Sequence, residues 1–500
     1  MGIVIYVHNL RLISYCNKMN NSCFISRKLL VITAIVWLGL PLVIFLIGWL
    51  RPILGYPLAI GVIWASFRTI STLESSHEAI VYIDRKFWIM TAFVLMFTIF
   101  SGIGGFAYQR FWDHAFRNAV FNDLVNYPWP VLETNDEGVS ELLCYYHAFW
   151  LPAAVIAKIA GSVLVGNIMQ LIYAFVGYMT VAIFVFNIIG QRNIKLWVIV
   201  LLALFSGWNI VIFFISSPDL VKVFTVSEIY QVDKEISFGF LSAPGFPALS
   251  MFIYNSGIAS WMAFGLLYDQ RNNIPRLIFL YSLLFLFAPI PVVGLFPALT
   301  YWICRKLKMA FSLENVIGVL IFLIVGVYFL SNHRTDGFKP TAFYSFGEFC
   351  WKTVVFVLLS YVIYLPYIWK YVRQDVFFWI LCGTTIVIPY FSLNGQNDLG
   401  SRIGIPLTYC FVVLVIKSVS EIRQWPRYKA VGLIVTLIIG AINSSSIYSV
   451  SAVMSYRCII SGTQLRQTCM PTTFDDKVNP LKENFVARGE SMFTKYLMKQ

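Results

Sequence analysis

Long apolar runs, each near 20 residues, constrain the fold of this chain more than any other feature. They recur along most of its 500 residues, of which 59% are hydrophobic and only 12% are charged. Soluble domains are about 25% charged. An apolar run of about 20 residues can cross a bilayer as a helix, and the helix satisfies its own backbone hydrogen bonds there. We therefore expect an all-α, polytopic integral membrane protein.

The apolar runs predict about 13 transmembrane helices. The two runs that meet at Pro289 and Pro291 are each short, so one long kinked helix is the alternative there. We place the spans at roughly 29–50, 52–70, 87–105, 166–189, 195–215, 247–268, 276–290, 291–304, 312–331, 348–369, 376–392, 403–420 and 429–448.

The lysine and arginine residues gather at alternate ends of these spans, which predicts the topology. We place the N-terminus in the cytoplasm, because most cations then lie on the cytoplasmic side. The net charge of +13 follows this distribution and does not indicate nucleic acid as a partner. The chain divides into a basic cytoplasmic lead-in (1–28), a transmembrane domain (29–448) and a non-cytoplasmic tail (449–500). Outer loops are expected over 106–165, 216–247, 332–347 and 393–402.

Known catalytic and metal-binding motifs are missing from the sequence. It contains no Walker loop, no G-x-S-x-G and no H-E-x-x-H, and its nine cysteines form no CxxC pair. Cys458 and Cys469 lie in the tail, where an oxidising space would allow them to form a disulfide. The spans hold almost no acidic or basic residue, which argues against a proton-coupled pump.

The first outer loop gathers polar and aromatic residues at the membrane edge, and we expect a helix lying on the membrane over 111–126. Asp113 and Arg117 are four residues apart and can reach each other, and His114 and Asn118 form the next row. An apolar stripe recurs every four residues: Phe116, Val120 and Leu124. The short apolar segment 147–161 contains Pro152 and Lys158, and we interpret it as a helix along the outer face.

Each of these features also has a simpler interpretation. Asp113 and Arg117 can pair on a solvated helix face, and the aromatic residues can belong to the interfacial belt of a membrane protein. Arg402 and Lys158 lie near the bilayer surface, where they can hold a lipid phosphate or extend to the interface as helix-end cations do.

The order of elements over most of residues 87–420 resembles the GT-C superfamily of polytopic glycosyltransferases. That family has a long first outer loop with an acidic residue on a juxtamembrane helix, and Trp112–Asp113 occupies this position here. The segment YYHAFWLPAAVIAKIAG (145–161) looks like the family's second element. GQNDLGSRIGIPLTYCFVVLV (395–415) is similar to its late span entry.

The resemblance implies transfer of a sugar from a polyprenyl-phosphate donor to a cell-surface glycan or lipid, on the outer face of a bacterial inner membrane. It makes Asp113 the candidate general base, with Asp123 as the alternative. Many members carry two adjacent acids, whereas His114 follows Asp113, so a bound divalent metal is left open. Candidate substrate-binding residues are Trp112, His114, Arg117, Asn118, Tyr145, Tyr146, Lys158, Asn397, Asp398 and Arg402.

Two other classes of protein compete with this interpretation. A polymerase or ligase of the O-antigen type is also polytopic, but typically has an arginine-rich outer loop, which this sequence lacks. A transporter or flippase would show inverted repeats or broken helices with polar groups at the midplane, and neither is evident.

Overall fold

The computed structural model describes residues 23–73, 79–109, 111–134, 138–208, 210–211, 245–332, 338–340, 345–393, 398–475 and 477–499. The chain is mostly helical. Within these ranges, six helical stretches are long and apolar enough to cross a membrane. They are α2 (Arg27–Trp49), α3 (Pro52–Ser71), α7 (Val163–Ile189), α16 (Leu313–Leu330), the stretch Phe346–Val372 with α17 (Phe346–Ser360) and α18 (Leu365–Val372), and α22 (Arg427–Ser461).

Shorter helices occupy the remaining apolar runs. They are α4 (Arg85–Phe100), α8 (Leu196–Leu204), α12 (Phe246–Phe252), α13 (Tyr254–Asp269), α14 (Ile274–Ser282), α15 (Pro289–Cys304), α19 (Val376–Val387) and α21 (Ile405–Ser420). The two runs around Pro289 form separate helices, α14 and α15, so the single kinked helix is not found. A nine-residue helix such as α8 is roughly 14 Å long, about half the hydrocarbon thickness. The number of crossings therefore stays a prediction.

The buried centre of the molecule lies where α2, α7 and α13 meet. The Trp37 ring stacks on Tyr173 and on Phe287, with centroids 4.4 Å and 5.1 Å away. A Cβ added at Gly177 of α7 would lie 2.6 Å from Ile258 of α13. Helices in membranes approach each other at such small residues, because packing is what holds them together there.

Contacts between connecting segments form two groups, and the first lies at the N-terminal end of α2. There β1 (Phe24–Ser26) pairs with β2 (Ala79–Tyr82) in an antiparallel arrangement. The Tyr82 amide donates to the Arg192 carbonyl over 3.2 Å. We call this region the basic end, and its ion pairs join Arg27 to Asp269, Arg68 and Arg276 to Glu314, and Lys370 to Glu421.

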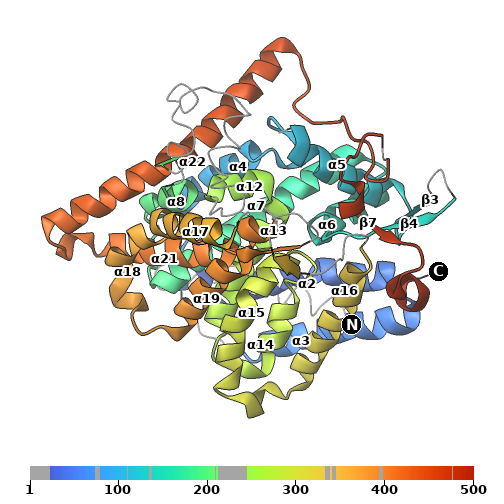
Figure 1. Ribbon diagram of the computed structural model, residues 1–500, viewed down its shortest axis with the longest axis horizontal. Coiled ribbons are helices and arrows are strands. Elements are labelled where there is room, and N and C mark those ends of the chain that lie inside the picture. Colours follow the sequence, from blue (N-terminus) through green and yellow to red (C-terminus); the bar gives the residue numbers. More distant parts are fainter. Residues whose placement is uncertain are drawn as a thin grey trace.

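The second group lies at the opposite end of α2, and we call it the α5 end after the helix α5 (Phe111–Asn126). A three-stranded sheet forms there from β3 (Leu132–Thr134), β4 (Ser140–Leu143) and β7 (Val486–Arg488). Isolated bridges join Leu50 to Met498 and Asn332 to Ala487. The C-terminal tail, red in Figure 1, runs from the end of α22 past α5 to β7.

Helix α16 shows how single helices connect the two ends. Glu314 in its first turn pairs with Arg276 at the basic end. Tyr328, near its other terminus, donates to the Leu143 carbonyl over 3.0 Å and lies 3.1 Å from His147 Nδ1. The strand pairs, bridges and ion pairs of each end join segments that the lysine and arginine distribution predicts on one side of the membrane. Which side each end faces stays a prediction.

Two expectations for the C-terminal region are corrected. Helix α22 continues to Ser461, so residue 449 lies within a helix and is not the start of a tail. The predicted disulfide is also absent, since Cys458 and Cys469 are both free thiols. Cys458 is buried in the last turns of α22, whereas Cys469 is exposed on the tail. The continued helix buries the Cys458 side chain against the protein, whereas the Cys469 thiol stays exposed.

Candidate functional site

Helix α5 has the bounds that the sequence predicted, Phe111–Asn126. Val120 and Leu124 are fully buried, and the half-buried Phe116 stacks on Phe485 with ring centroids 5.5 Å apart. The apolar stripe is thus confirmed. The helix ends before Pro128 and Pro130, which cannot donate the backbone hydrogen bonds of a further turn.

Part of the polar face of α5 is covered by the C-terminal tail. Asn118 Nδ2 donates to Gln109 Oε1 over 2.7 Å and to the Gln467 carbonyl over 2.8 Å. Arg466 Nη2 donates to Asn122 Oδ1 over 3.1 Å. Gln467 and Arg466 belong to the C-terminal tail. The tail therefore shields the part of the face that carries Asn118 and Asn122, whereas the Asp113 side chain is 44% exposed.

His114 ties α5 to the end of α4. Its Nε2 lies 3.1 Å from the Ser101 carbonyl, and the side chain is buried. Its ring also lies 6.2 Å from the ring of Tyr254. His114 and Asn118, both predicted to bind substrate, thus have clear roles in holding α5 in place.

Asp123 is almost completely buried under the tail. Its Oδ2 accepts hydrogen bonds from the Thr473 amide over 2.8 Å and from Thr473 Oγ1 over 2.6 Å. Burial raises the pKa of Asp123 to about 6, and the bonds from Thr473 act in the opposite direction. Asp123 lies roughly 15 Å along the helix axis from Asp113. Its surroundings disfavour the role of alternative base.

Asp113 and Arg117 pair as predicted, with Oδ1 and Nη1 3.7 Å apart. The Asp113 side chain is 44% exposed, whereas that of Arg117 is only 8% exposed. The guanidinium of Arg117 lies 5.4 Å from the ring centroid of Tyr254. Its Nε and Nη1 make no hydrogen bond to any residue within the described ranges. Buried arginine nitrogens are normally hydrogen-bonded, so this arrangement is typical of a site that receives an anion.

A second arginine lies against the pair Tyr145–Tyr146, which follows β4. The two tyrosine rings are 3.9 Å apart. Arg402, at the end of α20 (Asp398–Arg402), donates to the Tyr146 hydroxyl and lies 5.4 Å from its ring centroid. Burial raises the pKa of Tyr145 well above its usual value, while the charges of Arg402 and Arg117 both act to lower it. Both guanidinium groups therefore lie close to Tyr145.

Aromatic side chains form a continuous wall between the two arginines. The Trp150 ring lies 6.4 Å from that of Tyr145 and 6.1 Å from that of Tyr254. Tyr254 is the first residue of α13, and the guanidinium of Arg117 lies over its ring. We call this group the Arg117 site, and it comprises Asp113, Arg117, Tyr145, Tyr146, Tyr254 and Arg402.

Other predicted residues lie away from the Arg117 site or cannot be compared with it. Lys158 is exposed on α6 (Leu151–Ala160), where it donates to the Tyr127 carbonyl and lies 5.5 Å from the ring centroid of Trp129. Partial desolvation of its ammonium group lowers the pKa of Lys158. Trp112 lies in the first turn of α5, and Asp398 begins α20. Asn397 falls outside the described residues, as does most of the outer loop 216–247.

Sequence reasoning missed Tyr254 and Arg466. Tyr254 lies within a predicted span, where an aromatic residue carries no signal of a site. Arg466 lies in the tail, and its aliphatic chain covers Gly105, with carbon atoms 3.2–3.3 Å from where a Cβ would stand. The charge of Arg466 also acts on Tyr254. A third arginine is thereby brought near the Arg117 site by a segment remote in sequence.

The Arg117 site offers two kinds of chemistry. Guanidinium groups bind phosphate and carboxylate through charge-assisted hydrogen bonds, and an exposed carboxylate can accept a proton. Among the residues that the structure describes, no three His, Cys, Asp or Glu side chains gather as metal ligands. Comparison with protein-family models, with curated proteins and with solved structures finds no match to this chain.

Proposed function

We propose that this protein is a membrane glycosyltransferase of the GT-C type that takes a sugar from a polyprenyl-phosphate donor. The sugar passes to a cell-surface glycan or lipid at the α5 end, which faces outward from a bacterial inner membrane in this proposal. The observation that carries the proposal is Arg117, a buried cation. Its Nε and Nη1 make no hydrogen bond to any described residue, and the partly exposed carboxylate of Asp113 lies 3.7 Å away.

The donor phosphate has a natural place between Arg117 and Arg402. Arg117 lies 5.4 Å from the ring centroid of Tyr254 and Arg402 lies 5.4 Å from that of Tyr146, so the two cations flank the same aromatic wall. The lipid phosphate is the leaving group when the bond to the anomeric carbon breaks. The two guanidinium groups would bind this phosphate through charge-assisted hydrogen bonds. Arg466 of the tail adds positive charge on the side of Tyr254.

Asp113 is the proposed general base. Its exposure leaves room for an acceptor hydroxyl, whose proton it would take as the oxygen attacks the anomeric carbon. Inversion at that carbon follows from a single displacement. The ion pair with Arg117 orients the Asp113 carboxylate beside the phosphate.

Sugar transfer by the full-length protein in liposomes tests the proposal. The liposomes contain polyprenyl-phosphate-linked sugars and cell-envelope acceptor from the source membranes. Mass spectrometry follows free polyprenyl phosphate and the sugar mass gained by the acceptor. We expect Asp113→Asn to slow transfer by about 10²–10⁴-fold, as loss of a general base typically does.

Asp123→Asn is the matched control, because it changes the same functional group on the same helix. It should transfer sugar at a rate near that of the unmodified protein. Normal transfer by Asp113→Asn at normal protein level would remove Asp113 from the mechanism. No transfer by the unmodified protein with any donor would reject the glycosyltransferase proposal and favour a transporter.

A further inference from the structure

A pocket of about 750 Å³ opens at the basic end, remote from the Arg117 site. It lies where α4 and α8 begin and where α21 passes into the short helix Ile422–Gln424. Three helix boundaries thus meet at one level of the molecule. In a membrane protein, this is where the hydrocarbon region gives way to lipid headgroups.

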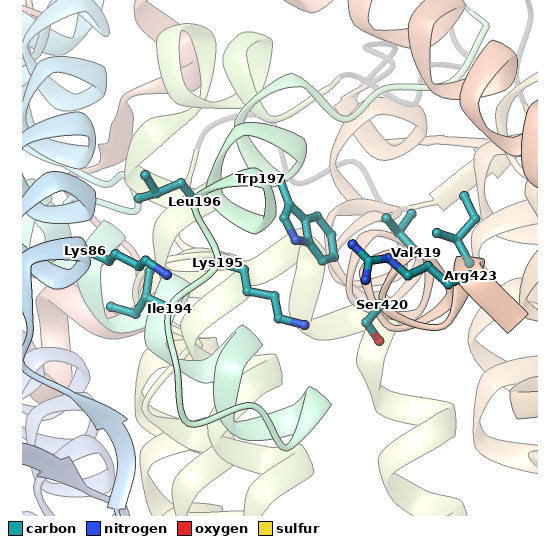
Figure 2. A pocket seen from close by; sticks show the side chains of 9 residues that line it. Lys86, Ile194, Lys195, Leu196, Trp197, Val419, Ser420 and Arg423 are labelled. Carbon is teal, nitrogen blue, oxygen red and sulfur yellow. The ribbon is translucent and has the colours of Figure 1, made fainter.

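Three cations from three separate segments line this pocket. Lys86 lies in the first turn of α4, Lys195 caps α8, and Arg423 follows α21. Figure 2 shows Lys195 and Arg423 extending into the same space beside Trp197, with Lys86 farther along the pocket. Among the residues that the structure describes, no acidic side chain lines the pocket. Within the described part of the chain, none of the three cations forms an ion pair.

The surroundings make this concentration of charge unusual. Four other cations at the basic end have acidic partners: Arg27 pairs with Asp269, Arg68 and Arg276 with Glu314, and Lys370 with Glu421. Lys86 and Lys195 lie at helix N-termini, where the helix dipole already favours an anion. Two acids lie near the pocket. Asp84 caps α4 by accepting from the Phe87 amide, and Glu421, between the lining residues Ser420 and Ile422, pairs with Lys370. An anion from outside the chain would therefore be stabilised here.

The walls of the pocket are apolar, which restricts the class of ligand. Leu196, Trp197, Val419 and Ile422 line it between the cations. A small soluble anion would leave these surfaces without a partner. An amphiphile with a phosphate and acyl chains satisfies both parts of the lining. Basic pockets between membrane helices on the cytoplasmic side commonly bind such headgroups.

We propose that this pocket binds an anionic phospholipid, with its phosphate among Lys86, Lys195 and Arg423 and an acyl chain against Leu196 and Trp197. The inference does not depend on the glycosyltransferase proposal, since it concerns a different end of the molecule. The lipid would join α4, α8 and α21, which are separate in sequence, and so stabilise their packing.

Thermal unfolding of the full-length protein in a non-ionic detergent tests the inference. Dioleoyl-phosphatidylglycerol should raise the Tm, and native mass spectrometry should detect the bound lipid. Dioleoyl-phosphatidylcholine should have a much smaller effect. The double variant Lys195→Gln with Arg423→Gln should weaken the apparent affinity for phosphatidylglycerol by about 30-fold, given the usual contribution of each cation near a lipid surface.

The control removes two exposed cations at the same end but outside the pocket, Lys306→Gln with Lys308→Gln. It should bind phosphatidylglycerol as the unmodified protein does. Equal stabilisation by both lipids, or unchanged phosphatidylglycerol binding by the pocket variant, would overturn the inference. Equal stabilisation by inorganic phosphate alone would show that the ligand is a soluble anion. If the double variant does not fold, the two single variants and Lys86→Gln provide the same test.

Discussion

Asp113 and Asp123 lie on one helix, ten residues apart, and the two halves of α5 give them opposite surroundings. Asp113 is 44% exposed and faces a buried arginine, whereas Asp123 is buried and accepts two hydrogen bonds from Thr473. The same carboxyl group can thus accept a proton from a substrate in one half and hold the tail in the other. The two roles differ because the C-terminal tail packs over Asp123 and leaves Asp113 exposed.

The largest effect on stability should come from deleting the C-terminal tail, so that the chain ends after Ser461. This deletion removes β7 from the sheet, the bridge to Leu50, and the tail contacts with Asn118 and Asp123. Each buried polar group left without a partner costs about 1–3 kcal/mol. We expect the truncated protein to lose its sharp thermal transition and to aggregate on size-exclusion chromatography.

Thr473→Val is the graded counterpart of the deletion. It removes one hydrogen bond to Asp123 and keeps the tail and the backbone amide. Its Tm should fall by only a few degrees, and its sugar transfer should continue. A tail deletion that behaves like Thr473→Val would show that the tail does not hold α5 in place.

The second effect is a dependence of stability on pH that arises from the Asp123 carboxyl group. Its pKa in the folded protein, about 6, lies above the ordinary value of 3.8. The protonated carboxyl therefore favours the folded state, so this contribution is complete below about pH 4 and is lost as the pH rises through 6. The difference between the two pKa values corresponds to a contribution of about 3 kcal/mol to the free energy of unfolding.

Thermal unfolding of the unmodified protein and of Asp123→Asn, measured between pH 4 and pH 8, isolates this contribution from those of other groups. The difference in Tm between the two proteins should change across the window from pH 4 to pH 6 and stay constant above it. A constant difference throughout would mean that Asp123 titrates normally and that the tail leaves it open to water.

The third effect concerns the half of α5 that carries Asp113 and the affinity of the Arg117 site for the lipid donor. Arg402→Ala removes one of the two guanidinium groups near Tyr145. We expect about a tenfold rise in the KM for the lipid donor with little change in kcat, as loss of a binding contact gives. Steady-state transfer rates over a range of donor concentrations measure both constants. A fall in kcat with constant KM would place Arg402 in the chemical step instead.

The smallest effect should come from Lys158→Ala, which changes a cation beside the Asp123 half. Lys158 contacts Tyr127 and Trp129 and is exposed, so its removal should cost under about 1 kcal/mol in stability. The donor KM should not change. A rise in KM equal to that of Arg402→Ala would mean that the phosphate site extends along the whole of α5, and the contrast between its halves would fail.

Local patterns in the sequence predicted a large part of α5. The bounds of the helix, its apolar stripe and the pair Asp113–Arg117 all follow from spacing along one helix. The apolar runs similarly predicted where helices form, since each run contains a helix in the structure. The two-sided grouping of loops followed from the alternation of basic residues.

The sequence did not indicate which polar residues of α5 would be buried. Asp123 and Thr473 are 350 residues apart, and Asn118 and Gln467 are 349 apart. Contacts at such separations leave no periodic signal in the sequence. Two distant segments can pack together without any change in the spacing of apolar and polar residues within either of them. For the same reason the tail suggested a disulfide from its two cysteines, although α22 continues and buries one of them.

The sequence by itself therefore determined that the chain is helical and apolar, where its helices lie, and which carboxylate and arginine face each other on α5. Only the tertiary structure decided that Arg117 is buried, that Tyr254, Arg402 and Arg466 come near it, and that Asp123 belongs to the packing of the tail. Helical spacing is fixed by the local geometry of the backbone. Burial depends on which distant segment packs against a face, and so on the fold as a whole.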